Sequence, residues 1–180
     1  VAAEVASDRT FDDAWDRWLE DRMAEGDAVL VRGMTCGLKL DALKAAARTV
    51  VKERDILGRE ETAPPFGADS LLDRMRAAVV TLRGLRPMCT NRDDEAYRSV
   101  LDLESDLARA ERLDAVSREQ FFREMHVVYS RGQQGNWSPK DACKDVKGEL
   151  KAVRLAQEAY VAASSAHLAW ALRDRLRGFL

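Results

Sequence analysis

Apolar side chains recur every three or four residues along most of the chain, which is the spacing of one face of an α-helix. The first stripe spans 11–25, with spacings of 4, 3, 1 and 4 between its members (Phe11, Trp15, Trp18, Leu19 and Met23). Thr10 precedes it as a capping residue, and Gly26 supplies a stop. We therefore predict a first helix over about 11–25.

Five more stretches have the same period and predict helices over 42–58, 71–85, 90–113, 118–132 and 139–178, two of them beginning at Thr90 and Ser117. A short apolar segment at 27–37 predicts a helix of two to three turns, or a strand over its apolar residues. Alternation of period two is nowhere sustained. The expected fold class is all-α: about seven helices in antiparallel pairs, as a bundle or a short helical-repeat array, with a long C-terminal helix.

The longest predicted connection, 59–68, contains Pro64 and Pro65, which exclude helix there. The 180 residues are expected to form a single helical domain, 1–180, or two lobes, 1–58 and 69–180, joined by this connection.

The final predicted helix carries alanines at spacings of 4, 3, 4 and 3 (Ala152, Ala156, Ala159, Ala163 and Ala166). Small residues at heptad spacing let a neighbouring backbone approach closely. Fourteen consecutive uncharged residues, 159–172, would span about 21 Å as a helix, too short for a hydrocarbon core of about 30 Å. We interpret this seam, bounded by Tyr160 and Trp170, as a helix-packing surface within the fold or against a partner subunit.

Basic residues form a stripe at spacings of 4, 3, 4 and 3 (Lys140, Lys144, Lys147, Lys151 and Arg154), and an acidic stripe lies beside it (Asp141, Asp145 and Glu149). One interpretation is a solvated face with ion pairs at i, i+3, and the other is contact with an acidic protein partner. Trp137 precedes this helix in a loop, where it either covers the core or anchors a contact.

Charge is unevenly distributed although the net charge is only −2. Residues 1–25 hold eight acids and three arginines, whereas residues 118–180 hold eleven bases and seven acids. The overall balance gives no case for nucleic acid or an anionic membrane as partner.

The three cysteines, Cys36, Cys89 and Cys143, are widely separated, which favours a reducing compartment over a disulfide framework. No apolar run is long enough to span a bilayer. A start at Val1 is typical of a processed import product, so we favour the mitochondrial matrix, with the cytoplasm as the alternative.

No catalytic, cofactor or metal site is predicted. The two histidines, His126 and His167, lack the neighbours of di-iron or zinc motifs, and neither a nucleophile elbow nor a phosphate-binding glycine loop occurs.

One stretch, 121–141, resembles the pentatricopeptide-repeat pattern, in which a Phe, a Glu-Met pair, a Gly and a Pro follow in order (Phe122, Glu124, Met125, Gly132 and Pro139). The interval from Gly132 to Pro139 is longer than in that pattern. The resemblance implies an RNA-binding helical repeat.

Three functions follow as hypotheses. The leading one is a non-catalytic helical accessory or scaffold subunit of a larger complex, with an organellar (mitochondrial) assembly favoured. The alternatives are a small-molecule-binding or enzymatic helical bundle that uses the His167 region, and the pentatricopeptide-like RNA-binding repeat.

Overall fold

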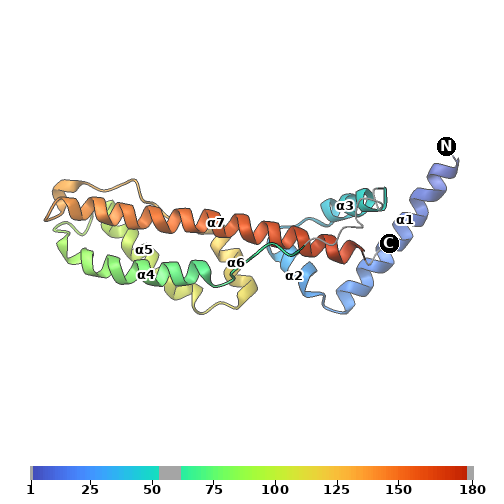
Figure 1. Cartoon of the computed structure of the whole chain (residues 1–180), viewed down its shortest axis with the longest axis horizontal. Helices are drawn as coiled ribbons and strands as arrows, with labels where there is room; N and C mark the ends of the chain where they lie inside the picture. Colours follow the sequence, from blue (N-terminus) through green and yellow to red (C-terminus); the bar gives the residue numbers. More distant parts are fainter. Residues whose placement is uncertain (1, 53–61, 178–180) are drawn as a thin grey trace. The chain divides into compact units, whose positions relative to one another are not determined.

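The computed structural model describes residues 2–52 and 62–177, with side chains from Arg9 onwards. Seven α-helices occur in these ranges (Figure 1): α1 (Ala2–Ala24), α2 (Ala28–Thr35), α3 (Leu40–Lys52), α4 (Ser70–Leu85), α5 (Glu95–Ala110), α6 (Ala115–Glu124) and α7 (Asp141–Arg177). Two short 3₁₀ helices, η1 (Arg86–Met88) and η2 (Gln134–Asn136), lie in loops. The only β-pairing in the described ranges is one antiparallel bridge between Cys89 and Trp137. The predicted all-α class with a long C-terminal helix is confirmed.

The first three helices differ from the prediction mainly at their ends. Helix α1 begins at Ala2 rather than near residue 11, and it ends before Gly26, whose φ of 66° favours glycine. The segment after it is helical, not a strand, because the Asp27 carboxylate caps it by accepting hydrogen bonds from the Val29 and Leu30 amides. The end predicted for the next helix, at residue 58, lies outside the described residues.

Aspartates rather than hydroxyl residues begin α5 and α6, so the predicted starts at Thr90 and Ser117 are wrong. The Asp114 carboxylate accepts from the backbone amides of Val116 and Ser117, both at 3.0 Å. Thr90 instead donates from its amide and its hydroxyl to the Asn136 carbonyl. A carboxylate satisfies two free amides at a helix start and also offsets its positive dipole end.

Helix α6 stops at Glu124, and the predicted continuation to residue 132 is wrong. The chain is extended at Met125 (φ −61°, ψ 147°) and contains no helix from there until η2. The buried Gln157 side chain donates from Nε2 to the carbonyls of Phe122 and Met125, at 2.8 and 2.6 Å. These bonds from α7 take the carbonyls that the next helical turn would use.

Two compact units make up the chain: Phe66–Ser164, and Val1–Pro65 together with Ser165–Leu180. Their boundary at Pro65–Phe66 falls within the connection predicted over 59–68. The predicted lobes differ in one respect, because they assign 165–180 to the second lobe. Helix α7 therefore contributes its N-terminal part to one unit and its C-terminal part to the other.

The core of the Phe66–Ser164 unit gathers apolar residues from α4, α5, α6 and α7 around Phe122, which is completely buried. The Phe122 ring meets Tyr160 edge-on, with ring centroids 5.2 Å apart, and Tyr160 also contacts Phe66 at 5.3 Å. Burial of this kind is the main stabilising term of the unit.

The other unit has a smaller core made by α1, α2, α3 and the C-terminal turns of α7 (Trp15, Leu30, Leu43, Ala47, Leu168, Leu172 and Leu176). Trp15 is buried, and its ring lies 5.2 Å from that of Trp18. An ion pair between Arg175 and the carboxylate of Asp27, 3.0 Å long, connects α7 to the start of α2.

Candidate protein-binding site on helix α7

The loop that leads into α7 is anchored by the buried carboxylate of Asp94 at the start of α5. One oxygen accepts from the Gln133 amide and the Asn136 side chain, both at 2.8 Å. The other accepts from the Trp137 indole at 3.2 Å and from the Ala96 amide at 2.9 Å. Helix α7 starts at Asp141, close to the predicted Ser138-Pro139 signal.

The electrostatics of Asp94 follow from these bonds. Burial acts to raise the pKa of the carboxyl group, but the hydrogen bonds from Gln133, Asn136, Trp137 and Ala96 outweigh it and lower the pKa below its ordinary value. Gly132 makes the close approach possible, because it has a φ of 107° and a Cβ there would lie 2.5 Å from the Ala96 Cβ. The entry to α7 is therefore a closed, hydrogen-bonded structure.

One side of α7 within this unit is buried at spacings of 4, 3, 4, 3 and 4 (Val146, Leu150, Val153, Gln157, Tyr160 and Ser164). The Ser164 hydroxyl donates to the buried carboxylate of Glu119, and the Arg123 guanidinium lies 2.5 Å from the same hydroxyl. Polar groups on this side are thus paired with α6, as buried polar groups require.

The opposite side of α7 is exposed at spacings of 4, 3, 4, 4 and 3, and we call it the exposed α7 face (Lys144, Gly148, Lys151, Leu155, Ala159 and Ala162). Leu155 is the large apolar residue of this face, and 55% of its surface is exposed. A helix that buries one stripe normally presents polar residues on the opposite side. The exposed α7 face is polar in its first half and apolar in its second.

A groove of about 330 Å³ adjoins the apolar half of this face. Its walls come from α7 and from the segment that enters α4 (Phe66, Gly67, Ser70, Leu71, Ala156, Ala159, Tyr160 and Ala163). Three alanines of the predicted seam therefore line an open groove: Ala159 is exposed, and Ala156 and Ala163 are half-buried, as is Ala152. Ala166 belongs to the other compact unit.

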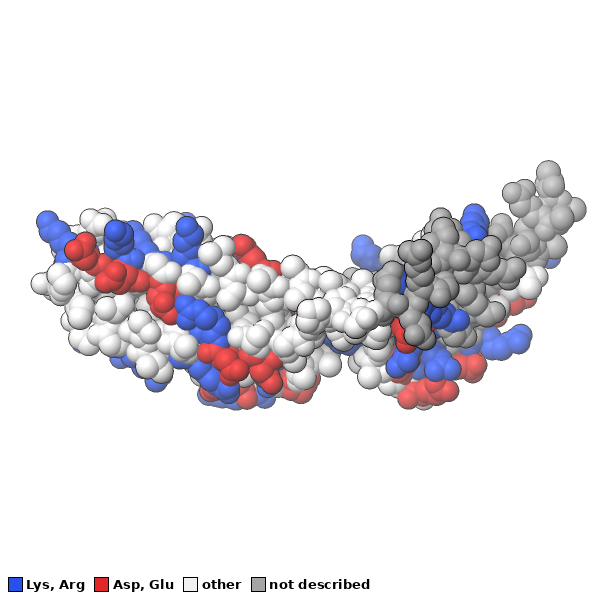
Figure 2. All heavy atoms as spheres, in the orientation of Figure 1, with Lys and Arg blue, Asp and Glu red and all other residues white. Residues whose placement is uncertain are grey.

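The predicted i, i+3 ion pairs along the basic stripe do not form among the described residues. Lys147 donates to the Gly132 carbonyl at 2.8 Å, Arg154 pairs with Glu158 at 2.9 Å, and the acidic Glu149 pairs with Arg74 of α4 at 2.7 Å. Figure 2 shows basic and acidic atoms in neighbouring rows over the N-terminal part of α7. Within the described ranges, three lysines of the stripe have no ion-pair partner (Lys140, Lys144 and Lys151).

Two of the three aromatic candidates, Trp137 and Tyr160, lie inside the protein. Trp137 is 3% exposed and Tyr160 is 5% exposed, so Trp137 covers the core in the manner of the first of its two predicted roles. Trp170, in the other unit, is half-buried, with its ring 5.9 Å from that of His167. The Nδ1 atom of His167 lies 3.0 Å from an Arg32 nitrogen, and His167 is not among the residues that line the groove beside Ala159.

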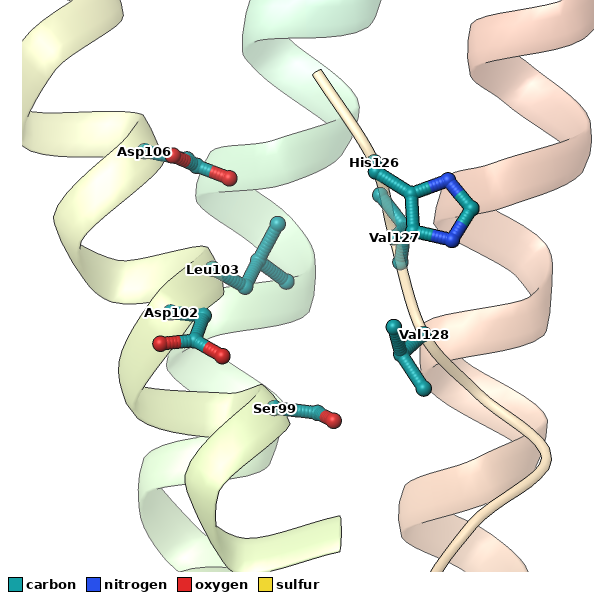
Figure 3. Close-up of a pocket in the computed structure, with 7 residues that line it drawn as sticks. All are labelled: Ser99, Asp102, Leu103, Asp106, His126, Val127 and Val128. Carbon is teal, nitrogen blue, oxygen red and sulfur yellow. The ribbon is translucent and has the colours of Figure 1, made fainter. Parts of the chain in front are cut away.

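A small pocket between α5 and the extended segment after α6 holds two carboxylates (Figure 3). Its volume is about 20 Å³, room for about one water molecule. The ring of His126 projects to the side away from Asp102 and Asp106 (Figure 3). Burial, followed by the charge of Asp102, raises the pKa of Asp106. The pocket is too small for an organic substrate.

A larger apolar groove, about 460 Å³, lies in the other unit between α3 and the last turns of α7. Its lining includes one charged residue, Arg173, so it carries little information about an occupant. Within 2–52 and 62–177, no group of three or more His, Cys, Asp or Glu residues could hold a metal ion. No helix in the same ranges combines the length and apolarity needed to cross a membrane.

No protein-family model matches the chain, and neither a curated protein nor a solved structure is significantly similar to it.

Sequence reasoning did not select Leu155, Ala162 or Gly148 as interface residues, although a signal was present. These residues continue the heptad spacing of Lys144 and Lys151, so they share one helical face with two charged residues. A large apolar residue on a face marked by lysines is expected to be exposed.

Proposed function

We propose that the protein is a non-catalytic helical accessory subunit that is held in a larger protein complex through the exposed α7 face. The observation that carries this proposal is the exposed Leu155 beside an apolar groove of about 330 Å³. Covering the rest of one leucine side chain contributes about 1 kcal/mol, and filling the groove adds to it. An apolar face and groove on the same helix are typical of a docking surface.

The compartment is part of the same proposal. We favour a mitochondrial assembly over a cytoplasmic one, and in both cases a reducing environment. The cysteines support the reducing environment, because Cys36, Cys89 and Cys143 form no disulfide and burial raises the pKa of both Cys89 and Cys143. Thiols of this kind are stable in reducing compartments.

Purification of the untagged protein from its own cells, followed by mass spectrometry, tests the proposal. We expect other subunits to co-purify in fixed ratio. Leu155→Glu should release them, whereas Val80→Glu, at a residue of α4 that is 71% exposed, should not. Recovery of the native chain alone, as a stable monomer of 20.2 kDa, would sink the proposal.

A further inference from the structure

We infer that the partner element seated on the exposed α7 face is an amphipathic α-helix that carries acidic side chains at heptad spacing. The inference rests on the proposed function and specifies the chemistry of the partner. It follows from the spacing of the face, from its small residues and from its charges.

The spacing of the face fits a helix. Lys144 and Lys151 are seven residues apart, and so are Leu155 and Ala162. Seven residues of helix rise about 10 Å, so a second helix at a small crossing angle meets these positions with its own heptad. All backbone groups in the middle of α7 are bonded within the helix, so an extended strand would find no edge to pair with.

Small residues let this partner approach closely. Gly148 has open space where a Cβ would lie, and Ala159 and Ala162 are exposed. Helix axes lie 8–10 Å apart depending on the contact residues, and glycine and alanine permit the lower end of this range. The groove beside Ala159 then accepts large apolar side chains from the partner.

The charges on the exposed α7 face specify the sign of the charge that the partner's contacting side chains carry. Lys144 and Lys151 are the basic residues of the exposed α7 face, and neither has an ion-pair partner among the described residues. Two exposed acids also lie along this side: Glu158, seven residues after Lys151, and Asp141, seven residues before Gly148. Glu158 is paired with Arg154, and Glu149 is paired with Arg74. Asp141 stands in the first turn of α7, where a negative charge offsets the helix dipole. The remaining charges lie on neighbouring sides of α7 (Lys140, Asp145 and Lys147). A partner with glutamates or aspartates seven residues apart complements the two free lysines.

Helix α1 of a second copy is the strongest competing occupant. Its exposed Asp13 and Glu20 are also seven residues apart. Among the α1 residues whose side chains the structure describes, however, Met23 is the only large apolar residue that is exposed, and exposed ion pairs alone contribute little. Single-stranded RNA fits less well, because the exposed α7 face carries no aromatic residue on which a base could stack.

Two designed peptides of about 21 residues test the inference. Both have a leucine face, and they differ only in flanking residues, which are glutamate in one and lysine in the other. We expect fluorescence anisotropy to show that the purified protein binds the glutamate peptide at least tenfold more tightly than the lysine peptide. A higher salt concentration should reduce this difference in affinity, because salt screens the charges.

Substitutions in the protein test whether the peptide binds at the exposed α7 face. The Lys144→Glu/Lys151→Glu variant should lose at least tenfold in affinity for the glutamate peptide and gain affinity for the lysine peptide. The control Lys39→Glu/Lys52→Glu makes the same charge change at two exposed lysines of the other unit and should stay within twofold. Leu155→Glu should weaken binding of the glutamate peptide, and Val80→Glu should not.

Equal affinity for both peptides, no binding of either, or equal effects of the two lysine pairs would overturn the inference. Self-association that competes with the peptide would identify a second copy instead, and RNA that does so would identify a nucleic acid. The proposed function and this inference are distinguished by co-purification. If subunits co-purify with the native protein but Lys144→Glu/Lys151→Glu retains them, the function stands and the acidic helix does not.

Discussion

Leu150 and Leu155 are five residues apart on α7, yet one is completely buried and the other is 55% exposed. The side that carries Leu150 is packed and hydrogen-bonded to α6 through Gln157 and Ser164. The side that carries Leu155 ends at an open groove. The interior of this unit is therefore complete without the exposed α7 face, and the apolar residues of that face do not serve the fold of the isolated chain.

The largest expected effect separates these two leucines. Leu150→Ala should lower the free energy of unfolding by about 2–5 kcal/mol, because it leaves a cavity. Leu155→Ala should change it by no more than about 0.5 kcal/mol, as at other surface sites. Urea denaturation of the purified variants measures both. A loss at Leu155 as large as that at Leu150 would mean that the face is covered within the chain.

Asp94 holds the loop that leads into α7 by hydrogen bonds, in the same unit. Asp94→Ala should cost about 3 kcal/mol, because it leaves the Trp137 indole and the Asn136 amide without their acceptor. The pKa of Asp94 is lowered in the folded protein, so its contribution is present above the ordinary pKa of 3.8 and is lost as the pH falls through the lowered value.

Thermal unfolding between pH 7 and pH 2 measures this loss. The fall in melting temperature on the acid side should be shallower in Asp94→Asn, which cannot titrate at this position. An unchanged acid profile in that variant would show that Asp94 is not the group responsible.

Gly132 lies in the tightly packed loop before α7, whereas Gly148 lies on the exposed α7 face, so alanine should have opposite effects on stability at the two positions. Gly132→Ala should lower stability by about 2 kcal/mol or more, because φ is 107° and the new Cβ would clash with Ala96. Gly148→Ala should instead raise stability by about 0.5–1 kcal/mol, since it lies within α7 in open space. Melting temperatures that move in the same direction for both would contradict the account.

The smallest effect is expected at Asp106. Its pKa is raised by burial and then by the charge of Asp102, so the ionised group opposes folding at neutral pH. Asp106→Asn should therefore stabilise the protein at pH 7 by less than about 1 kcal/mol. Stability from this group rises as the pH falls through the raised pKa, opposite in sign to Asp94. If the variant gained nothing at pH 7 relative to pH 4, the shift would be refuted.

The sequence predicted the elements better than their ends. Periodicity identified the helices because each buries an apolar stripe, and the Ser138-Pro139 signal located the start of α7. The predicted helix at 118–132 extended beyond the end of α6, because the hydrogen bonds that end α6 come from Gln157. Gln157 is 35 positions away from Phe122, so no local pattern contains these bonds. Likewise, Asp94 has the local pattern of a helix start, and its role as acceptor for the loop at 133–137 exists only in three dimensions.

The candidate site was predicted in part. Helical spacing placed Ala156, Ala159 and Ala163 on one side of α7, and all three line the groove. The final helix is apolar on nearly every side, so spacing alone could not show which sides of α7 are buried by the other helices of the unit and which stay exposed. That distinction depends on where α4 and α6 pack, which no local pattern contains.

Hydroxyl-radical footprinting of the natural protein can show whether a partner covers the exposed α7 face, because it reports the exposure of single aliphatic side chains. Leu155 and Val80 should both be oxidised in the purified chain. In the native assembly we predict that Leu155 is protected several-fold while oxidation of Val80 is unchanged. Equal oxidation of Leu155 in the two preparations would contradict a partner on the exposed α7 face.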